Sequence, residues 1–179
     1  MRLLAGAVLA LLTLAPPGAA QALRVVAVAD FVDETVDGYQ IGAVRLSADL
    51  QAYLAAQGRD RLRVVAVDEV RAAIRARGYA PADLVSPTKA AEIAQAVGAD
   101  WLITGRWVYL DLDRERQAGV RVPALAQAVI EIRVLQASTR RTLLNDTFSG
   151  IGFGLTNAFL LRQAARVALQ RAAARISNL

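Results

Sequence analysis

The chain has 179 residues and a formal net charge of +5, and it contains neither cysteine nor histidine. Its length suits one domain that buries its own core. Without cysteine or histidine, Ser-His-Asp and Cys-His catalysis, thiolate redox chemistry, disulfides and His- or Cys-ligated metal sites are excluded. The charge is small and acidic residues alternate with arginines, which argues against a nucleic-acid-binding protein.

Residues 1–22 have the pattern of a secretory signal peptide. Arg2 precedes an apolar run over 3–15, and small residues at 20–22 form a cleavage site. The run is shorter than the ~20 residues that span a bilayer, although an uncleaved anchor is the alternative. We therefore expect one periplasmic domain over 23–179. It lacks the cysteine of a lipoprotein anchor, and no later stretch predicts a membrane span.

The next third of the chain alternates strand and helix patterns. Continuous apolar residues predict buried strands over 24–31 and 62–67. Between them, apolar residues recur with the helical period over 39–57, and Gly58 ends that helix. We expect Asp68 to be the N-cap of a second helix, over 69–77.

The middle of the chain contains a third helix and a central strand. Ser86 is predicted as the N-cap of a helix over 87–97, because Pro87 suits the first helical position. The segment 98–107 then predicts a strand through the middle of the domain. The charged segment 111–121 predicts a hairpin connection or an exposed loop.

The last third is mostly strand until a final helix. Alternating apolar residues over 124–136 predict a strand with one wet face, and a second strand follows over 142–149. Three alternate glycines over 150–154 predict a flexible joint. A helix is expected over 156–177, with an apolar stripe that includes Leu161 and Ile176.

The predicted order is β-α-β-α-α-β-β-β-α in a mixed α/β (α+β) fold of two or three layers. Helical crossovers make the first three strands parallel, and tight connections make the last three antiparallel. No internal repeat divides the chain, so we expect one domain.

Four carboxylates follow the first strand and form the first candidate site. Carboxyl ends of strands are the usual ligand-binding edge of an open α/β sheet, and such oxygens suit Mg²⁺ or Ca²⁺. Turn formation and solvation explain the same residues, and their spacing is not that of an EF-hand. The loop spans 30–37 and its candidate residues are Asp30, Asp33, Glu34 and Asp37.

Two motifs have an enzymatic reading that we do not adopt. Ser86 and Lys89 match a serine–lysine catalytic motif, but its partner motifs are absent and Ser86 suits a helix cap. The glycines over 150–154 lack the spacing and the lysine of a phosphate-binding loop.

A candidate partner surface combines tryptophan and arginine, which are enriched at interface hot spots. The two tryptophans are six residues apart on one strand and therefore point to the same face, where a core role is the alternative. The candidate residues are Trp101, Arg106, Trp107, Arg114, Arg116, Arg162 and Arg166.

Several segments, in this order, resemble a family of exported domains. They are V-A-V-A-D-F-V-D-E-T at 26–35, V-V-A-V-D-E-V at 64–70, G-A-D-W-L-I-T-G-R at 98–106 and I-E-I-R-V-L-Q-A-S-T-R-R-T-L-L at 130–144. The sequence resembles the α/β domain shared by the curli secretion component CsgG, the penicillin-binding-protein activator LpoB and the N-terminal domain of TolB. It lacks the lipidated cysteine and segments long enough for transmembrane hairpins.

The resemblance implies a non-catalytic periplasmic factor that binds an envelope protein or helps to assemble a complex, without a cofactor. A small-ligand or divalent-metal protein, or a carboxylate-based hydrolase, that uses residues 30–37 is the alternative. A self-assembling homo-oligomer is a third hypothesis.

Overall fold

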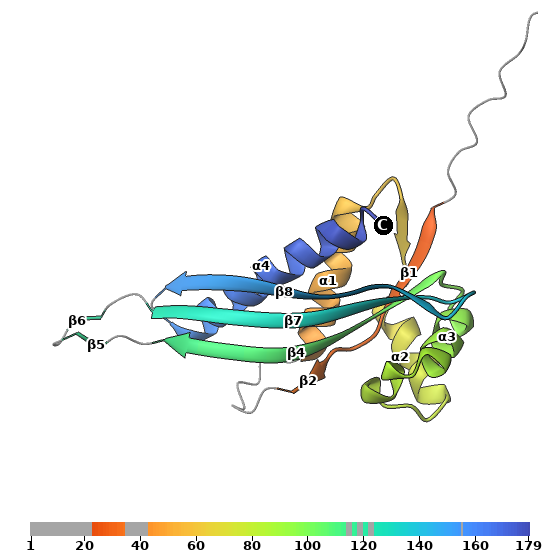
Figure 1. Ribbon diagram of the computed structural model, residues 1–179, viewed down its shortest axis with the longest axis horizontal. Coiled ribbons are helices and arrows are strands. Elements are labelled where there is room, and N and C mark those ends of the chain that lie inside the picture. Colours follow the sequence, from red (N-terminus) through yellow and green to blue (C-terminus); the bar gives the residue numbers. More distant parts are fainter. Residues whose placement is uncertain (1–22, 35–42, 114–115, 118–119, 122–123, 155) are drawn as a thin grey trace, which may run out of the picture.

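The computed structural model describes residues 23–34, 43–113, 116–117, 120–121, 124–154 and 156–179. Its main feature is a six-stranded mixed sheet in the order β3-β1-β4-β7-β8, with β2 paired to β4 (Figure 1). The strands are β1 (Arg24–Val28), β2 (Val32–Asp33), β3 (Leu62–Val64), β4 (Trp101–Asp113), β7 (Ala124–Gln136) and β8 (Arg141–Gly154). A small hairpin joins β5 (Arg116–Gln117) to β6 (Val120–Arg121) at the far end.

The predicted strand directions are confirmed. Strands β3 and β4 both pair with β1 in parallel, and β7 pairs with β4 and β8 in antiparallel fashion. The predicted strand over 124–136 is β7. The mixed α/β fold class and the single domain are also as predicted.

Helices cover both faces at one end of the sheet and one face at the other (Figure 1). Helix α1 (Ala43–Gln57) and the long α4 (Asn157–Ile176) pack on one face, and α2 (Val67–Ala76) and α3 (Pro87–Ala96) pack on the opposite face. The fold therefore has three layers around β1 and β3, and two layers along the outer length of β7 and β8. None of the helices in the described ranges combines the length and the apolar character of a membrane crossing.

The helical periodicity identified the buried faces correctly. Leu46, Leu50 and Leu54 of α1 are buried, as is the whole predicted stripe of α4 from Leu161 to Ile176. Helix α3 begins at Pro87 with Ser86 as its N-cap, as predicted, although the Ser86 side chain makes no capping hydrogen bond.

Several predicted boundaries were wrong. The strand expected over 62–67 ends at Val64, and the strand expected over 98–107 is β4, which continues to Asp113 into the predicted connection. The expected strand over 24–31 is divided into β1 and β2. The N-cap of α2 is Ala66, so Asp68 lies inside the first turn, where a carboxylate still stabilises the positive end of the helix. The glycines over 150–154 are not a joint, because β8 continues through them to Gly154.

These glycines let the backbone of α4 approach β8 closely. A Cβ atom on Gly150 would lie 2.7 Å from the Ala168 nitrogen and closer still to the Ala164 oxygen. A Cβ atom on Gly152 would meet the Leu160 oxygen in the same way. Alternate glycines therefore face the helix because no side chain fits between the two backbones.

A charged contact ties the end of β1 to two helices. Asp30 accepts hydrogen bonds from Arg71 of α2, at 2.8 and 2.9 Å, and from the Ser47 hydroxyl of α1, at 2.9 Å. The hydrogen bond from Arg71 to Asp30 raises the pKa of the Arg71 guanidinium. The Asp30 side chain is 17% exposed, so water screens this contact only in part.

We expect Gly152→Ala to lower the free energy of unfolding by about 1–3 kcal/mol, because the new methyl group collides with the α4 backbone. Chemical denaturation would measure the change. Gly154→Ala is the matched control, since its Cβ would meet the side chain of the exposed Phe159, which can move away. Equal stability of wild type and Gly152→Ala would contradict the close packing.

Asp30→Asn should lower the free energy of unfolding by about 1–3 kcal/mol, because the Arg71 guanidinium loses its charged acceptor in a half-buried position. Thermal or urea unfolding would show it. Asp60→Asn is the comparison, because Asp60 is exposed and has no ion pair within the described ranges. A change of the same size in both variants would refute the special role of Asp30.

Candidate functional site

The two tryptophans of the predicted partner surface lie in the core. Trp101 is 3% exposed and Trp107 is 1% exposed, and both point to the face that α1 and α4 cover. Their common face is as predicted from the spacing. Because both rings are buried, the structure places them with the core alternative, and a partner would not contact them directly.

Arg106 lies on the opposite face of β4 and bridges two carboxylates. Its guanidinium donates hydrogen bonds to Glu131 on β7 and, at 3.2 Å, to Glu34 after β2. The bond to Glu131, reinforced by the charge of Glu34, raises the pKa of Arg106. The positive charge of Arg106 is therefore largely neutralised by carboxylates of the same chain. Little electrostatic attraction is left for a partner.

The acidic loop does not assemble as a metal site in the part of the chain that is described. Asp30 binds Arg71 and Glu34 binds Arg106, so two of its carboxylates already have cationic partners. Asp33 is exposed on β2, and Asp37 lies outside the described residues. Within the described ranges, no three acidic side chains are grouped as metal ligands would be.

The serine–lysine motif has the wrong electrostatics for a nucleophile and its base. The Lys89 amine donates a hydrogen bond to Asp83 at 2.7 Å and lies 4.9 Å from the centre of the Tyr79 ring. The bond to Asp83 raises the pKa of Lys89, whereas a general base at neutral pH needs a lowered one. Lys89 therefore stabilises the 3₁₀ helix η1 (Pro81–Val85), to which Asp83 belongs.

A basic groove lies between α1 and α4. We call it the α1–α4 groove and define it by its lining: Arg45, Leu46, Asp49, Tyr53, Arg162, Ala165 and Arg166. Its volume is about 230 Å³. The spacing explains it, because residues four apart share a helix face, as Arg45, Asp49 and Tyr53 do on α1.

The α1–α4 groove brings together two of the predicted partner residues, Arg162 and Arg166, and adds Arg45. All three arginines are exposed. In the sequence, Arg45 shares one face of the first predicted helix with Asp49 and Tyr53. The packing of this helix against α4, which completes the groove, was not predicted. Arg114 lies outside the described residues, and the side chain of Arg116 does too.

The uncovered face of the sheet has exposed apolar side chains near its far end. Leu125 on β7 and Phe153 on β8 are direct neighbours across the strands and are 36% and 59% exposed. Ile151 follows on the same face of β8. These three residues form what we call the sheet-face patch; the sequence predicted Leu125 as a strand residue but placed Ile151 and Phe153 in a flexible joint.

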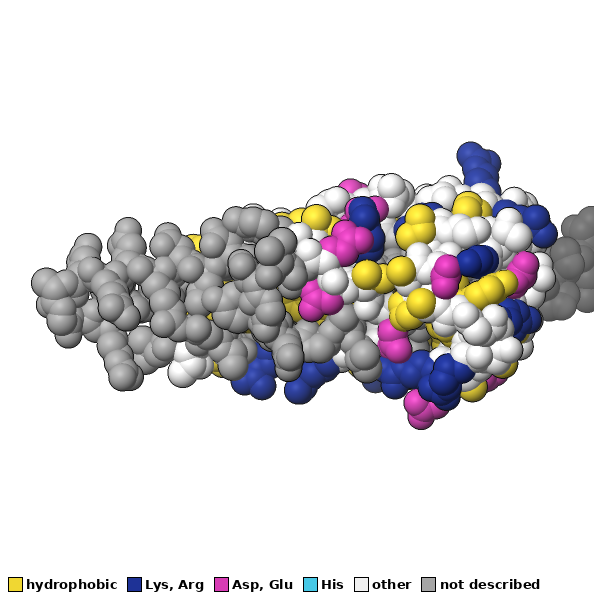
Figure 2. All heavy atoms as spheres, turned by 90° about the horizontal axis from the view of Figure 1, so that it is seen from below, with side chains coloured by type: hydrophobic (Ala, Val, Ile, Leu, Met, Phe, Trp, Pro, Cys, Tyr) yellow, Lys and Arg dark blue, Asp and Glu magenta, His cyan; other side chains and the backbone are white. Residues whose placement is uncertain are grey.

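The molecule seen from below has mixed surface chemistry. Figure 2 shows hydrophobic, basic and acidic side chains interspersed over the end that carries α2 and α3. On this face, the described residues form no continuous area of one charge. That distribution does not suit the extended phosphate backbone of a nucleic acid.

Side chains occupy the free edge of the sheet at β8. The Thr147 N–H donates to Asp146 at 2.8 Å, the Ser149 carbonyl accepts from Arg171 at 2.8 Å, and the Phe153 N–H donates to Gln163 at 2.9 Å. Backbone groups at alternate positions of an edge strand point away from the sheet. Arg171 and Gln163 both reach this edge from α4.

Comparisons with known proteins identify the fold but no family. No protein-family model matches the chain, and no curated protein matches its sequence. Among solved structures, the hypothetical protein CT253 from Chlamydia trachomatis has a TM-score of 0.57 at 12% identity, over 88% of this chain and 97% of that chain.

Two further structures share the fold. The NMR structure of E. coli LpoB has a TM-score of 0.53 at 18% identity, over 72% of this chain and 56% of that chain. The PelC dodecamer from Paraburkholderia phytofirmans has a TM-score of 0.51 at 15% identity, over 87% of this chain and 88% of that chain. The resemblance to LpoB is therefore supported as a likeness of fold, while that to CsgG and TolB stays a prediction.

Proposed function

We propose that the protein is a non-catalytic factor of the periplasm that binds another envelope protein through the α1–α4 groove. The observation that carries the proposal is the convergence of Arg45, Arg162 and Arg166 from two helices on one hollow. Arginine presents a planar set of donors that suits carboxylates, so the expected partner segment is acidic. The ring of Tyr53 adds an apolar wall with a polar tip.

Electrostatics within the fold support this choice of surface. Arg71 and Arg106 are bound to carboxylates of the chain, whereas Arg45 and Arg166 have no ion pair within the described ranges. Asp49 is the one carboxylate among the lining residues, so the groove keeps an excess of positive charge. A complementary acidic surface would associate faster and with a defined orientation.

The signal pattern over 1–22, the fold shared with LpoB and the poverty of catalytic residue types support the envelope location and the non-catalytic role. No contact in the described residues favours the metal-binding or hydrolase alternative. The carboxylates that it needs at Asp30 and Glu34 are held by arginines.

Self-association has one observation in its favour and is the second candidate. The sheet-face patch exposes Leu125, Ile151 and Phe153 at the far end of β7 and β8, where none of the described helices covers that side of the sheet. Exposed apolar side chains that adjoin one another mark interaction surfaces. The PelC protein that shares the fold is a dodecamer.

The double variant Arg45→Glu, Arg166→Glu should lose a partner that the wild-type mature protein recovers from periplasm and solubilised envelope. Reversing the charge of the α1–α4 groove places like charges against an acidic segment. The double variant Arg59→Glu, Arg63→Glu has the same change in net charge at exposed positions outside the groove, and it should recover the partner normally. The proposal fails if the wild type recovers no specific protein, or if both double variants lose it.

Phe153→Ser should shift the protein toward the monomer, because it removes the most exposed apolar side chain of the sheet-face patch. Sedimentation velocity over a range of concentrations would measure the shift. Phe159→Ser is the matched control, since Phe159 is 53% exposed on α4 and is not part of the patch. A wild type that is monomeric at all concentrations would exclude self-association.

A further inference from the structure

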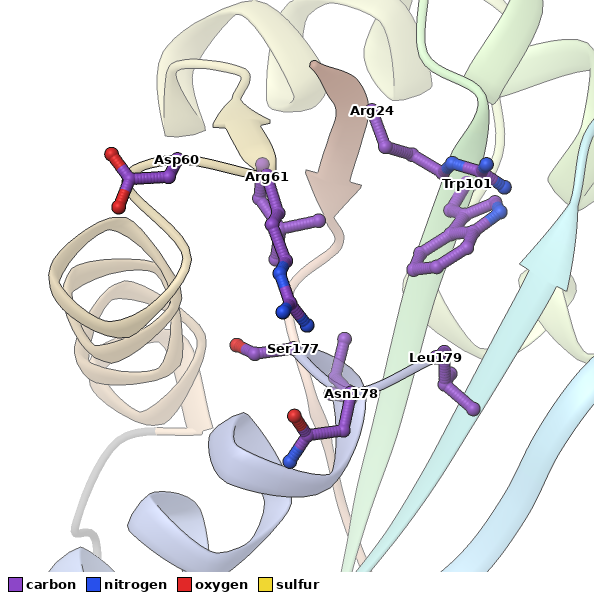
Figure 3. Close-up of a pocket in the computed structure, with 9 residues that line it drawn as sticks. Arg24, Asp60, Arg61, Trp101, Ser177, Asn178 and Leu179 are labelled. Atoms are coloured by element: carbon purple, nitrogen blue, oxygen red, sulfur yellow. The ribbon is translucent and has the colours of Figure 1, made fainter. Parts of the chain in front are cut away.

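A cavity of about 330 Å³ lies at the amino ends of the parallel strands, away from the α1–α4 groove. It is open to solvent and is lined by the start of β1, the turn before β3 and the last residues after α4 (Figure 3). Small-molecule sites begin at about 300 Å³, so the cavity has room for a ligand of modest size.

Two arginines stand at different ends of this cavity. The Arg24 guanidinium carbon lies 4.7 Å from the centre of the Trp101 ring, while Arg61 points toward Ser177 at the end of α4 (Figure 3). Neither arginine has an ion pair within the described ranges. Asp60 also lines the cavity, but its carboxylate points away from the Arg61 guanidinium in Figure 3.

Each end also holds a polar atom without a partner. Among the described residues, the buried side-chain nitrogen or oxygen atoms that have no hydrogen bond are Trp101 Nε1 and Ser177 Oγ. Both residues line this one cavity. A buried donor without an acceptor is costly, so its presence needs an explanation such as a ligand.

The lining also includes two apolar side chains, Leu62 and Ile176, which belong to the core on the α1 and α4 side of the sheet and are almost fully buried. The remaining lining residues are Asn178 and Leu179. The chemistry of the cavity is therefore set mainly by the donor groups at its two ends.

We propose that this cavity binds a small dicarboxylate. One carboxylate accepts hydrogen bonds from Arg24 and from Trp101 Nε1–H, the other accepts from Arg61 and from the Ser177 hydroxyl, and a short spacer joins the two across the cavity. Each end offers one cation and one neutral donor, which matches a singly charged carboxylate better than a phosphate dianion.

Arg24 now lies over the indole ring and shields its N–H from water. Rotation of its flexible side chain opens this end to a carboxylate while the charge stays at the site. This proposal concerns a different part of the molecule from the α1–α4 groove, so either one can fail without the other.

Isothermal titration calorimetry with linear dicarboxylates of about four to ten carbons tests the proposal, since these lengths fit the cavity. We expect saturable binding with an optimum at one chain length. The monocarboxylate of the same length should bind with an affinity lower by at least about tenfold, because one end loses its charge-assisted hydrogen bonds. No saturable binding of any dicarboxylate, or equal binding of both series, overturns the proposal.

Arg24→Gln and Arg61→Gln should each reduce the affinity for the best dicarboxylate to that of the monocarboxylate. Both arginines are exposed, so these variants should fold, which circular dichroism checks. Arg59→Gln removes an equal charge from the same turn without touching the cavity and should bind as the wild type does. Weakening by Arg59→Gln as large as by Arg61→Gln would show a general charge effect and overturn the site.

Discussion

The burial of the first half of β4 on both faces is the constraint on which the rest of the structure depends. Trp101 and Ile103 point into the core under α1 and α4, while Leu102 points into the core under α2 and α3. The same segment pairs with β1 on one side and β7 on the other. Because one strand supplies both cores and both kinds of pairing, a polar substitution there would disturb every layer.

Local patterns predicted elements well where one physical cause dominated. The alternation over 124–136 located β7, and Pro87 located the start of α3, because face burial and proline geometry act within a few residues. The missed features depend on contacts between distant segments. Gly150 and Gly152 look like a hinge in sequence, and only the backbone of α4 against β8 explains why they are strand residues.

The candidate surfaces show the same division. The spacing of Trp107 from Trp101 predicts that both point to one face, so the core alternative could be weighed from sequence. The pairing of Arg106 with Glu34 and Glu131 could not, since it joins β4, β7 and the residue that follows β2. Likewise, Arg45 lines the α1–α4 groove only because α1 packs beside α4. Long-range topology thus decides which arginines pair with carboxylates of the fold and which stay exposed without such a pair among the described residues.

The occupied edge of β8 has a consequence for how the protein can meet other chains. A long edge strand with free N–H and C=O groups is a template on which any extended polypeptide can dock. Here Asp146, Arg171 and Gln163 already hold outward backbone groups of that strand. The chain therefore resists indiscriminate pairing along this edge, so that contacts there with another chain would depend on side-chain chemistry.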